Sequence, residues 1–426
     1  MNRKSLNPEE KSSRMKGRGS VIEVATSTKQ TKIQKSLEKY TKDLIHIDKT
    51  ATEVDKASLK QEVFEKAASA IQSKHSYTEL IRKENELVRQ RDSSIDMDID
   101  DLTILDYSIK IIRLAQEKRE KGHQKNEVTI SKAILESGAI MFASSRKTKE
   151  NTKVIPIEKH ANGERVLTYY NPLGKASKFD SRVFIGLHKL WEDKGKNQQF
   201  TFTLYELCKV LNLTANGKNY QNIEHALEVL YNLSVEMRYY IKHKDEKIVT
   251  TRFHMLSADT TETIISSETK KTLNIKRAVI FSDLLQLSLL EGYVSYISLA
   301  LLEDIQKDTA HHLYLLLSSS KINEFGRCEY EFDDLCDIIG IKKEYPKYKK
   351  KQLLNEAIQE LIEVKVLSRH QYPRGTSKVL LYPSEWFATI INTEGKVIDE
   401  KAHDIPLLLE RIEEKRVAEK RTIINV

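Results

Sequence analysis

Two stretches of this chain, residues 181–256 and 298–382, predict the same succession of secondary structure, and this duplication constrains the fold more than any other feature. Each stretch begins with an amphipathic helix, continues with a short strand, a short helix, a turn and a longer helix, and ends with two strands joined by a polar tip. One such succession would say little, because helices and hairpins occur in every fold class. Two copies in the same order indicate a repeated domain.

The first copy is defined by its periodicity and by a helix-start signal. Its strand alternates apolar and polar residues. Thr203, with Glu206 three positions later, forms a capping box that is expected to start the short helix. The predicted elements are, in order, a helix at 181–193, a strand at 199–203, a short helix, a turn at 214–217, a helix at 220–233 and two strands at 235–242 and 247–256.

The second copy repeats this order. Asp333 is expected to cap its short helix and Gly340 to end it, because glycine readily adopts the left-handed conformation that follows many helices. The predicted elements are a helix at 298–319, a strand at 328–332, the short helix, a long helix at about 345–364 and two strands at 366–372 and 378–382.

A helix, a strand, a helix–turn–helix and a two-stranded ribbon together form the winged-helix arrangement. The sequence therefore predicts a helix-rich α+β fold with two tandem winged-helix domains, at 165–260 and 275–390. A helical N-terminal region, 31–145, is expected to precede them. Residues 1–30 are basic and lack apolar periodicity, so they predict a disordered arm, and residues 391–426 predict a helical tail.

The N-terminal region carries an apolar stripe with alternating spacings of four and three residues, which places it on one face of a helix. Two interpretations are open. The stripe can join two copies of the chain into a homodimer through residues 33–54, or it can pack an amphipathic helix onto its own domain. The stripe consists of Ile33, Leu37, Tyr40, Leu44, Ile47, Ala51 and Val54.

Composition excludes several classes of protein. No stretch of the 426 residues approaches the uncharged apolar length of a membrane-spanning helix, and the polar first residues predict no secretory signal. Cys208, Cys328 and Cys336 are far apart and form no C-x-x-C pair. This argues against a metal site or a disulfide framework and is typical of a reducing cytoplasm.

The net charge of +8 favours a polyanionic partner, and the second copy concentrates cations where they are informative. Four lysines fall within five positions at the start of its long helix. The helix dipole disfavours cations there by roughly 0.3–1 kcal/mol each, so a structural role does not explain them, whereas nearby phosphates do. Gln352 and Asn355 can pair with adenine edges. The predicted DNA-binding residues of this helix are Lys347, Tyr348, Lys349, Lys350, Lys351, Gln352 and Asn355.

The first copy has more amides and fewer cations at the equivalent place. These residues suit base reading, or they form an ordinary polar helix start; the parallel with the second copy favours base reading. They are Lys218, Asn219, Tyr220, Gln221 and Asn222.

The polar tips of the two ribbons are candidate wings, which can reach phosphates or a minor groove or can simply be solvated. The candidate wing residues are Arg369, His370, Arg374 and Lys378 in the second copy, and Lys242, His243, Lys244 and Lys247 in the first.

Enzymatic motifs are missing from the sequence, so we expect no catalytic centre and no cofactor. His311 and His312 are adjacent, with no apolar residue between them as a nicking site would need, and Gly174–Lys175 lacks the other residues of a phosphate-binding loop. His370 and Arg374 do not have the spacing of a tyrosine recombinase.

Residues 169–386 resemble the plasmid replication initiator protein A family. The resemblance rests on YYNPLGKASKFDSRVFIGLHKLW, FTFTLYELCKVL, GKNYQNIEHALEVL and LNEAIQELIEVKVL, which begin at Tyr169, Phe200, Gly217 and Leu354. It implies two winged helices in the bacterial cytoplasm that bind repeated sites in double-stranded origin DNA, help to melt the origin and recruit the host replicative helicase. Residues 1–150 have no counterpart in it.

The sequence thus predicts a DNA replication initiator of a plasmid or another mobile element. A tandem winged-helix transcriptional repressor remains an alternative, and operator footprints without origin melting would favour it. A non-specific DNA-binding or partitioning protein is a third interpretation, favoured by equal affinity for random and cognate DNA.

Overall fold

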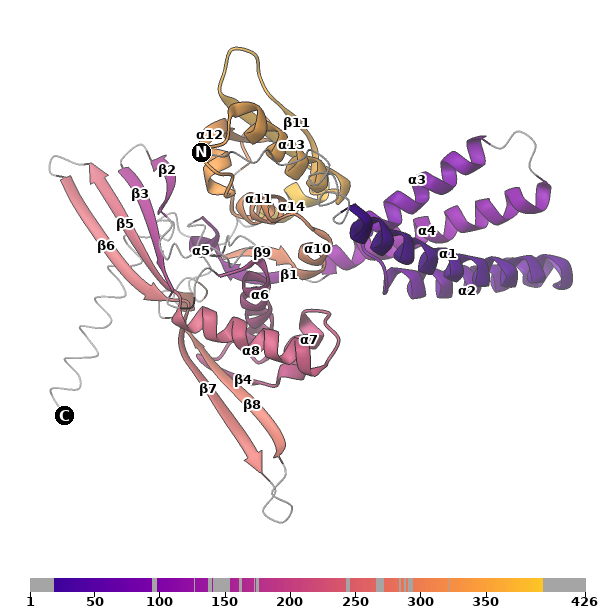
Figure 1. Ribbon diagram of the computed structural model, residues 1–426, viewed down its shortest axis with the longest axis horizontal. Helices are drawn as coiled ribbons and strands as arrows, with labels where there is room; N and C mark the ends of the chain where they lie inside the picture. The colour runs from indigo at the N-terminus through magenta and orange to yellow at the C-terminus, as the bar shows by residue number, and fades with distance from the viewer. Residues whose placement is uncertain are drawn as a thin grey trace, which may run out of the picture. The chain divides into compact units, whose positions relative to one another are not determined.

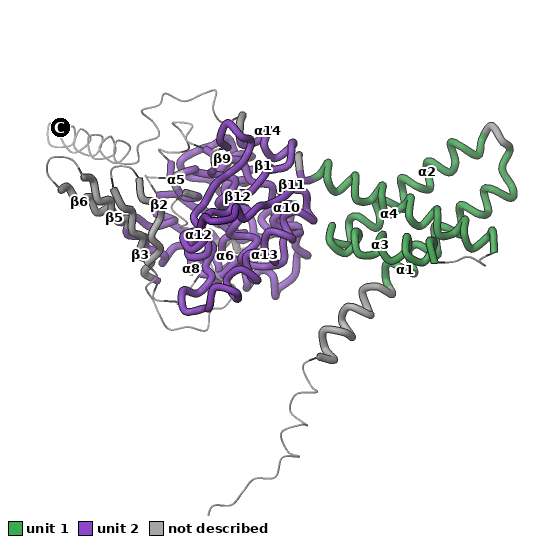
Figure 2. Tube along the Cα trace, turned by 90° about the horizontal axis from the view of Figure 1, so that it is seen from above, with its two compact units in different colours: residues 1–122 green, residues 123–426 purple. Residues whose placement is uncertain are grey.

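The chain divides into two compact units, residues 1–122 and 123–426, which are described separately (Figure 2). The computed structural model describes residues 19–93, 98–125, 127–136, 140, 154–160, 163–171, 173, 176–242, 246–265, 272–282, 285–286, 289, 294–320 and 322–393. The disordered arm predicted at 1–30 is wrong from residue 19 onward, because helix α1 (Gly19–Thr50) contains residues 19–30. Residues 1–18 of that arm, and residues 394–426 of the tail predicted at 391–426, lie outside the described residues. No helix among the described residues has the length and apolar character needed to cross a membrane.

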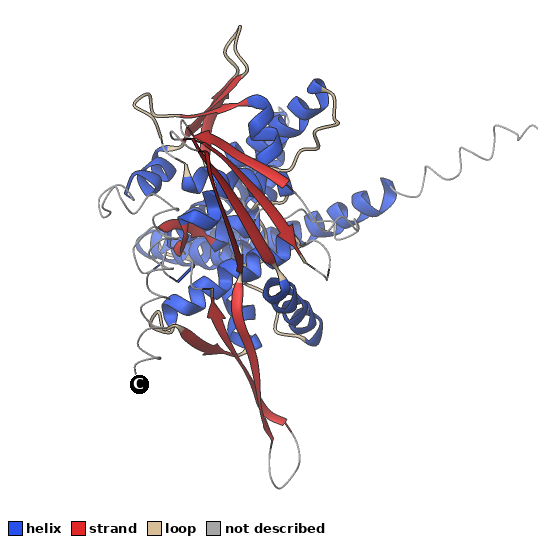
Figure 3. Cartoon of the chain, turned by 90° about the vertical axis from the view of Figure 1, so that its left-hand side faces the viewer, coloured by secondary structure: helices blue, strands red, loops and turns tan. Residues whose placement is uncertain are grey.

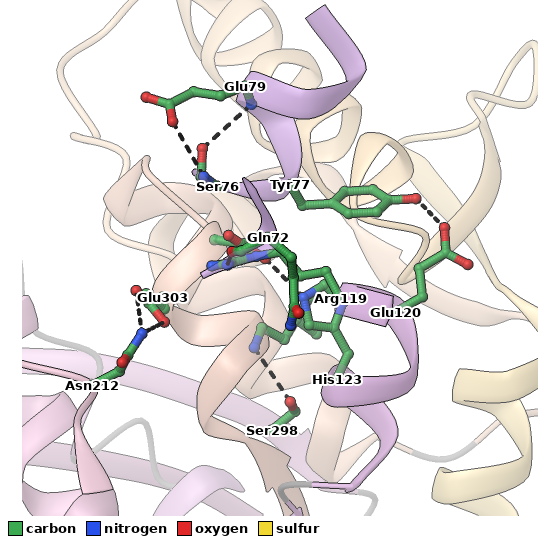
Figure 4. A network of polar contacts seen from close by, with 12 residues as sticks. Gln72, Ser76, Tyr77, Glu79, Arg119, Glu120, His123, Asn212, Ser298 and Glu303 are labelled. Carbon is green, nitrogen blue, oxygen red and sulfur yellow. Dashed lines mark hydrogen bonds and ion pairs between the residues drawn. The ribbon is translucent and has the colours of Figure 1, made fainter. Parts of the chain in front are cut away.

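The N-terminal unit is built from helices. They are α1 (Gly19–Thr50), α2 (Glu53–Gln72), α3 (Tyr77–Ser93) and α4 (Ile99–Lys125), the last of which ends beyond the unit boundary. Polar contacts support the packing of α4: Arg119 Nη1 donates to the backbone oxygen of Gln72 at 2.9 Å, and the Tyr77 hydroxyl donates to Glu120 (Figure 4).

The apolar stripe of α1 lies inside the core of this unit. Ile33, Leu37 and Leu44 are 2% exposed or less, and they belong to one cluster with residues of α2, α3 and α4. Of the two interpretations of the stripe, the structure shows packing within its own domain. A homodimer through residues 33–54 would have to take these side chains out of the core, which costs about 1.5–3 kcal/mol for each large apolar side chain.

The C-terminal unit is a helix-rich α+β structure, as the sequence predicts, with two winged-helix modules and a separate sheet (Figure 1). Strand β1 (Glu127–Ser131) pairs antiparallel with β9 (Val294–Ser298), and α5 (Lys132–Glu136) follows β1. Helix α14 (Glu385–Thr393) is the last described element.

The first module comprises α6 (Lys178–Asp193), β4 (Gln199–Phe202), α7 (Leu204–Val210), α8 (Gly217–Asn232), β7 (Leu256–Ile265) and β8 (Thr272–Phe281). Its strands form a sheet in the order β4-β8-β7. The capping box at the start of α7 is confirmed: the Thr203 hydroxyl accepts from Glu206 N–H, and the Glu206 carboxylate accepts from Thr203 N–H at 2.7 Å. The predicted alternation of β4 is confirmed, with Phe200 and Phe202 buried.

The predicted wing of the first module is wrong. Strands β5 (Ser234–Lys242) and β6 (Glu246–His254) form where strands are expected, but they pair in a four-stranded sheet with β2 (Val154–His160) and β3 (Gly163–Tyr170), in the order β2-β3-β5-β6 (Figure 3). The ribbon that pairs with β4 is the long hairpin of β7 and β8. The module therefore runs to Phe281, past its predicted end at residue 260.

The second module comprises α11 (Asp308–Ser319), β10 (Cys328–Glu331), α12 (Phe332–Ile338), α13 (Lys347–Glu363), β11 (Leu367–Gln371) and β12 (Lys378–Pro383). Its sheet has the order β10-β12-β11, so the first strand pairs with the last, as in the first module. The predicted order of this module is confirmed throughout, including the ribbon.

Two local predictions in this region need correction. The helix predicted at 298–319 is broken into α10 (Leu299–Asp304) and α11, because the backbone is extended at Ile305 and Lys307. At this break Lys178 Nζ donates to the backbone oxygens of Ile305 and Gln306, at 2.6 and 2.9 Å. Asp333 does not cap α12. The N-cap is Glu331, two residues earlier, and Asp333 lies in the first turn. Phe332 N–H donates to Ser377 O at 2.8 Å.

Both modules end the first helix of the helix–turn–helix in the same way. In the second module Gly340 has φ 83°, and Ile341 N–H donates to Cys336 O at 2.8 Å. In the first, Asn212 has φ 53°, and Leu213 N–H donates to Cys208 O at 2.8 Å. This Schellman motif satisfies the last carbonyls and sets the angle at which the longer helix follows.

Candidate nucleic-acid interface

Helix α13 begins without the groups that normally stabilise a helix N-terminus. Its N-cap residue is Pro346, which supplies no side-chain cap, and its first turn contains no acidic residue. Lysines follow at 347 and 349–351, where the helix dipole is positive. Lys347 is exposed and Tyr348 is 75% exposed, so the outward face of this turn is open to a ligand.

The structure assigns Lys350 to the packing of the helix–turn–helix. Its Nζ lies 3.0 Å from Asp333 Oδ1 of α12, and only 12% of its side chain is exposed. The hydrogen bond to Asp333 raises the pKa of Lys350, so this charge stays in place. Of the four lysines, Lys350 is therefore the one already neutralised.

Lys351 and Asn355 meet the residue that follows β11. Lys351 Nζ lies 4.6 Å from the ring centroid of Tyr372, and the Tyr372 hydroxyl donates to Asn355 Oδ1 at 2.6 Å. Burial raises the pKa of Tyr372 above its usual range, so the hydroxyl remains a donor. Asn355, predicted to pair with adenine, thus holds the wing against α13, whereas the Lys351 ammonium stays exposed.

Gln352 belongs to a short chain of polar contacts along the exposed face of α13. It accepts from Lys349 Nζ at 3.1 Å and donates to Glu356 Oε1 at 3.0 Å, and Glu356 also pairs with Lys307. Gln352 is exposed, and its partners Lys349 and Glu356 are half-buried. Its amide can exchange these contacts for a base edge without uncovering a buried group.

The carboxylate of Glu360 attaches α13 to the N-terminal end of α11. This residue is 7% exposed and accepts from the backbone N–H groups of Gln306 and Lys307. Burial raises the pKa of Glu360, while these two donors oppose the shift. The contact fixes the inner face of α13, so the lysine-bearing end projects in a defined direction.

The wing of the second module is exposed, and some of its basic side chains already contact other residues of the module. Arg374 is exposed in the hairpin turn, beside Gly375 with φ 75°. The Arg369 guanidinium lies 4.2 Å from the ring centroid of Tyr382, and Lys378 Nζ lies 3.4 Å from Glu329. His370 is half-buried, and burial, with Lys351 nearby, lowers its pKa. Arg374 is therefore an exposed wing cation that forms no ion pair with a described residue.

The equivalent end of α8 has a complete cap of its own. The Asn216 side chain accepts from Asn219 N–H at 2.9 Å, and Asn219 Nδ2 donates to Thr214 O at 2.7 Å. Asn219 therefore holds the turn, whereas Lys218, Gln221 and Asn222 are exposed and Tyr220 is half-buried. Three of the five predicted residues are available to a ligand.

Acidic residues lie beside α8. A pocket of about 500 Å³ between α8 and the β7–β8 ribbon is lined by Gln221, Glu224, His225, Glu228, Tyr231, Asp259 and Arg277. Arg277, in the β7–β8 ribbon, forms ion pairs with Glu224 and Asp259 at 3.2 and 3.4 Å. Its charge is therefore neutralised within the first module. Arg277 was not among the predicted site residues, because only the pairing of β8 brings it to α8.

Two of the predicted wing residues of the first module, Lys242 and Lys247, lie in the separate sheet. Lys242 ends β5 and Lys247 lies in β6, and their side chains are not described, while His243 and Lys244 lie outside the described residues. Cys208, Cys328 and Cys336 are buried and form no disulfide. Among the described residues, no three His, Cys, Asp or Glu side chains gather as a metal site would require.

Comparisons with known proteins leave the family open. No family model matches the chain, and no curated protein matches it. Among solved structures, two crystal structures of domains 2 and 3 of RctB are 10% identical over 59% of this chain and 97% and 99% of those chains, with TM-scores of 0.43 and 0.41. A crystal structure of Pi initiator protein in complex with iteron DNA is 12% identical over 62% of this chain and 99% of that chain, with a TM-score of 0.36.

Proposed function

We propose that this chain binds double-stranded DNA in a sequence-specific manner, with the N-terminal turns of α13 in a major groove. The observation that carries the proposal is the start of α13. Three lysines there form no ion pair with a described carboxylate, and they flank an exposed tyrosine at the positive end of the helix. Phosphates compensate this arrangement, because they accept hydrogen bonds from the side chains and from the free backbone N–H groups. Neither folding nor the helix dipole accounts for it.

The residues divide the work of binding. Lys347, Lys349 and Lys351 contribute affinity through phosphates, and Gln352 contributes sequence preference through a base edge. Arg374 extends the contact from the wing. In the first module, Lys218, Gln221 and Asn222 contact a second segment of the same duplex, with less contribution from charge.

The biological role that we propose is initiation of replication at the origin of a plasmid or another mobile element in bacterial cytoplasm. The resemblance of residues 169–386 to the plasmid replication initiator protein A family supports it. In this role the chain acts by binding and not by catalysis: it occupies origin repeats, helps to melt the adjacent DNA and recruits the host helicase. No cofactor takes part.

The test is a footprint on DNA from the protein's own gene neighbourhood, combined with permanganate reactivity of unpaired thymines. The proposal expects protected repeats with reactive thymines beside them. Protected sites without reactive thymines would support a transcriptional repressor in place of an initiator. Absence of any protected site would contradict sequence-specific binding.

A further inference from the structure

The outward face of α1 carries a row of basic side chains that the winged-helix modules do not explain. The row follows spacings of three and four residues, and at 100° per residue it occupies a sector of about 100°. With a rise of about 1.5 Å per residue, it extends for about 26 Å along the helix. Its members, all exposed, are Lys32, Lys35, Lys39, Lys42, His46 and Lys49. We call it the α1 basic row.

The lysines of the α1 basic row form no ion pair with any residue that the structure describes. Other cations of the same unit do: Lys60 pairs with Asp48, Arg113 Nε lies 2.6 Å from Glu84, and Lys83 Nζ lies 2.8 Å from Glu86. Glu38 and Asp43 flank the row without pairing to it. The row is thus a run of six basic side chains on one face of one helix, with no ion pair from its lysines.

Folding of the N-terminal unit gives no reason for this row. Only Lys49, in the last turn of α1, interacts favourably with the helix dipole. Like charges three and four residues apart repel one another. The opposite face of α1, with Leu37 and Leu44, is buried in the core, so the helix cannot turn the row away from solvent.

We propose that the α1 basic row binds the phosphate backbone of a DNA duplex without reading its sequence. A straight row of cations suits a linear polyanion, since duplex DNA carries about one charge per 1.7 Å of its axis. A membrane surface fits less well, because interfacial helices insert an apolar face and that face of α1 is buried. This site is additional to α13, and its contribution to affinity does not depend on base reading by α13.

The test uses the full-length chain in which Lys35, Lys39 and Lys42 are replaced by Gln, a residue with similar helix propensity. The matched control replaces Lys66, Lys74 and Lys121, three exposed lysines of the same unit outside the row, and has the same change in net charge. Affinity for a random 40-base-pair duplex is measured by fluorescence anisotropy across a range of salt concentrations. Circular dichroism verifies that all variants are folded.

For the row variant, we expect the slope of log affinity against log salt to fall by about 2 to 3, because each lost phosphate contact contributes about 0.9. We expect affinity near physiological salt to fall about tenfold or more, and the control to retain the wild-type slope. Equal slopes in row variant and control would overturn the proposal. So would an unchanged slope combined with lost binding to phosphatidylserine vesicles.

A third variant separates this proposal from the proposed function. Replacing Lys347, Lys349 and Lys351 by Gln tests α13 in the same assay and with a cognate duplex. If only this variant loses affinity, the α1 basic row fails and the proposed function stands. If only the row variant loses affinity, the row binds DNA and the assignment of α13 fails.

Discussion

The two winged-helix modules have the same strand order and the same Schellman turn, but their longer helices differ in charge. Helix α13 starts with four lysines, no acidic residue in its first turn and no side-chain cap, whereas α8 starts with one lysine and a complete Asn216 cap. Downstream, α8 borders a pocket lined by Glu224, Glu228 and Asp259. Topology places a helix where it can enter a groove, and the charges at its N-terminus decide whether it binds strongly there.

The interiors of the modules are more alike than their surfaces. The first helix of each module buries a histidine: His188 in α6 and His311 in α11 are both 0% exposed. Burial lowers the pKa of His188 to about 4 and that of His311 well below its usual value. Shared interiors with different surfaces are expected when packing and ligand binding use different faces of the same helices.

The largest expected difference between the modules lies in affinity. Replacing Lys347, Lys349 and Lys351 by Gln should lower affinity for cognate and random duplexes alike, by about a hundredfold at physiological salt, and reduce the salt slope by about 2 to 3. Replacing Lys218 should reduce the slope by less than about 1. Salt-titrated anisotropy measures both, and a larger effect from Lys218 would reverse the roles of the modules.

Acid should affect the interior of the first module through His188. Between the unfolded pKa of about 6.5 and the folded value of about 4, the unfolded chain binds the proton, so stability falls as the pH drops. Lowering the pH from 7 to 5 should therefore reduce the free energy of unfolding by about 2 kcal/mol through His188.

Replacing His188 by Phe should make unfolding less sensitive to pH by that amount, whatever constant change in stability the substitution causes. Chemical denaturation followed by fluorescence of the buried Trp191 measures the difference. An identical pH dependence in variant and wild type would show that His188 does not remain neutral in the folded chain.

Sequence preference should depend on glutamines in both helices. Replacing Gln352 by Ala should relax discrimination at one base pair by about 1–3 kcal/mol and leave non-specific affinity nearly unchanged. The same change at Gln221 should relax a different base pair by a similar or smaller amount. Selection of bound sequences from a pool of randomised duplexes measures the base preference at both positions. If neither variant alters the selected sequence, base readout lies elsewhere.

The smallest effect should come from releasing Lys350. Replacing Asp333 by Asn removes the carboxylate that neutralises this lysine, so non-specific affinity should rise by a few fold. The matched variant, Asp337→Asn, removes a carboxylate that pairs with Lys343. A rise in both variants would indicate general charge and not the position of Lys350.

Most of the second module could be predicted from sequence, because its signals are local. The alternating strand before Asp333, the helix end at Gly340 and the apolar face of α13 all occur within short segments. Strands β11 and β12 also follow one another and pair as a hairpin, so the predicted order leaves few arrangements.

The wing of the first module could not be predicted in the same way. Residues 234–254 have strong strand signals, but residues 199–202 pair with residues 277–280, far along the chain. Periodicity shows that a strand forms and not which strand it joins. The apolar stripe of α1 has the same limit, since Leu37 and Leu44 would look alike in a dimer interface and in a core.

The sequence predicts where the candidate site lies, and the structure corrects the roles of individual residues in it. The four lysines of α13 lie at the helix start that the sequence indicates. That Lys350 binds Asp333 and that Asn355 binds Tyr372 depends on side chains from other elements, which only the packed structure brings together.

The central claim is that this chain recognises duplex sequence, and the most direct measurement compares two duplexes of equal length across a salt titration. One is drawn from the protein's own gene neighbourhood, and the other is its scrambled counterpart. The account predicts a cognate preference of about a thousandfold or more at physiological salt. Equal affinity at every salt concentration would contradict it, because the lysines of α13 would then only neutralise phosphates.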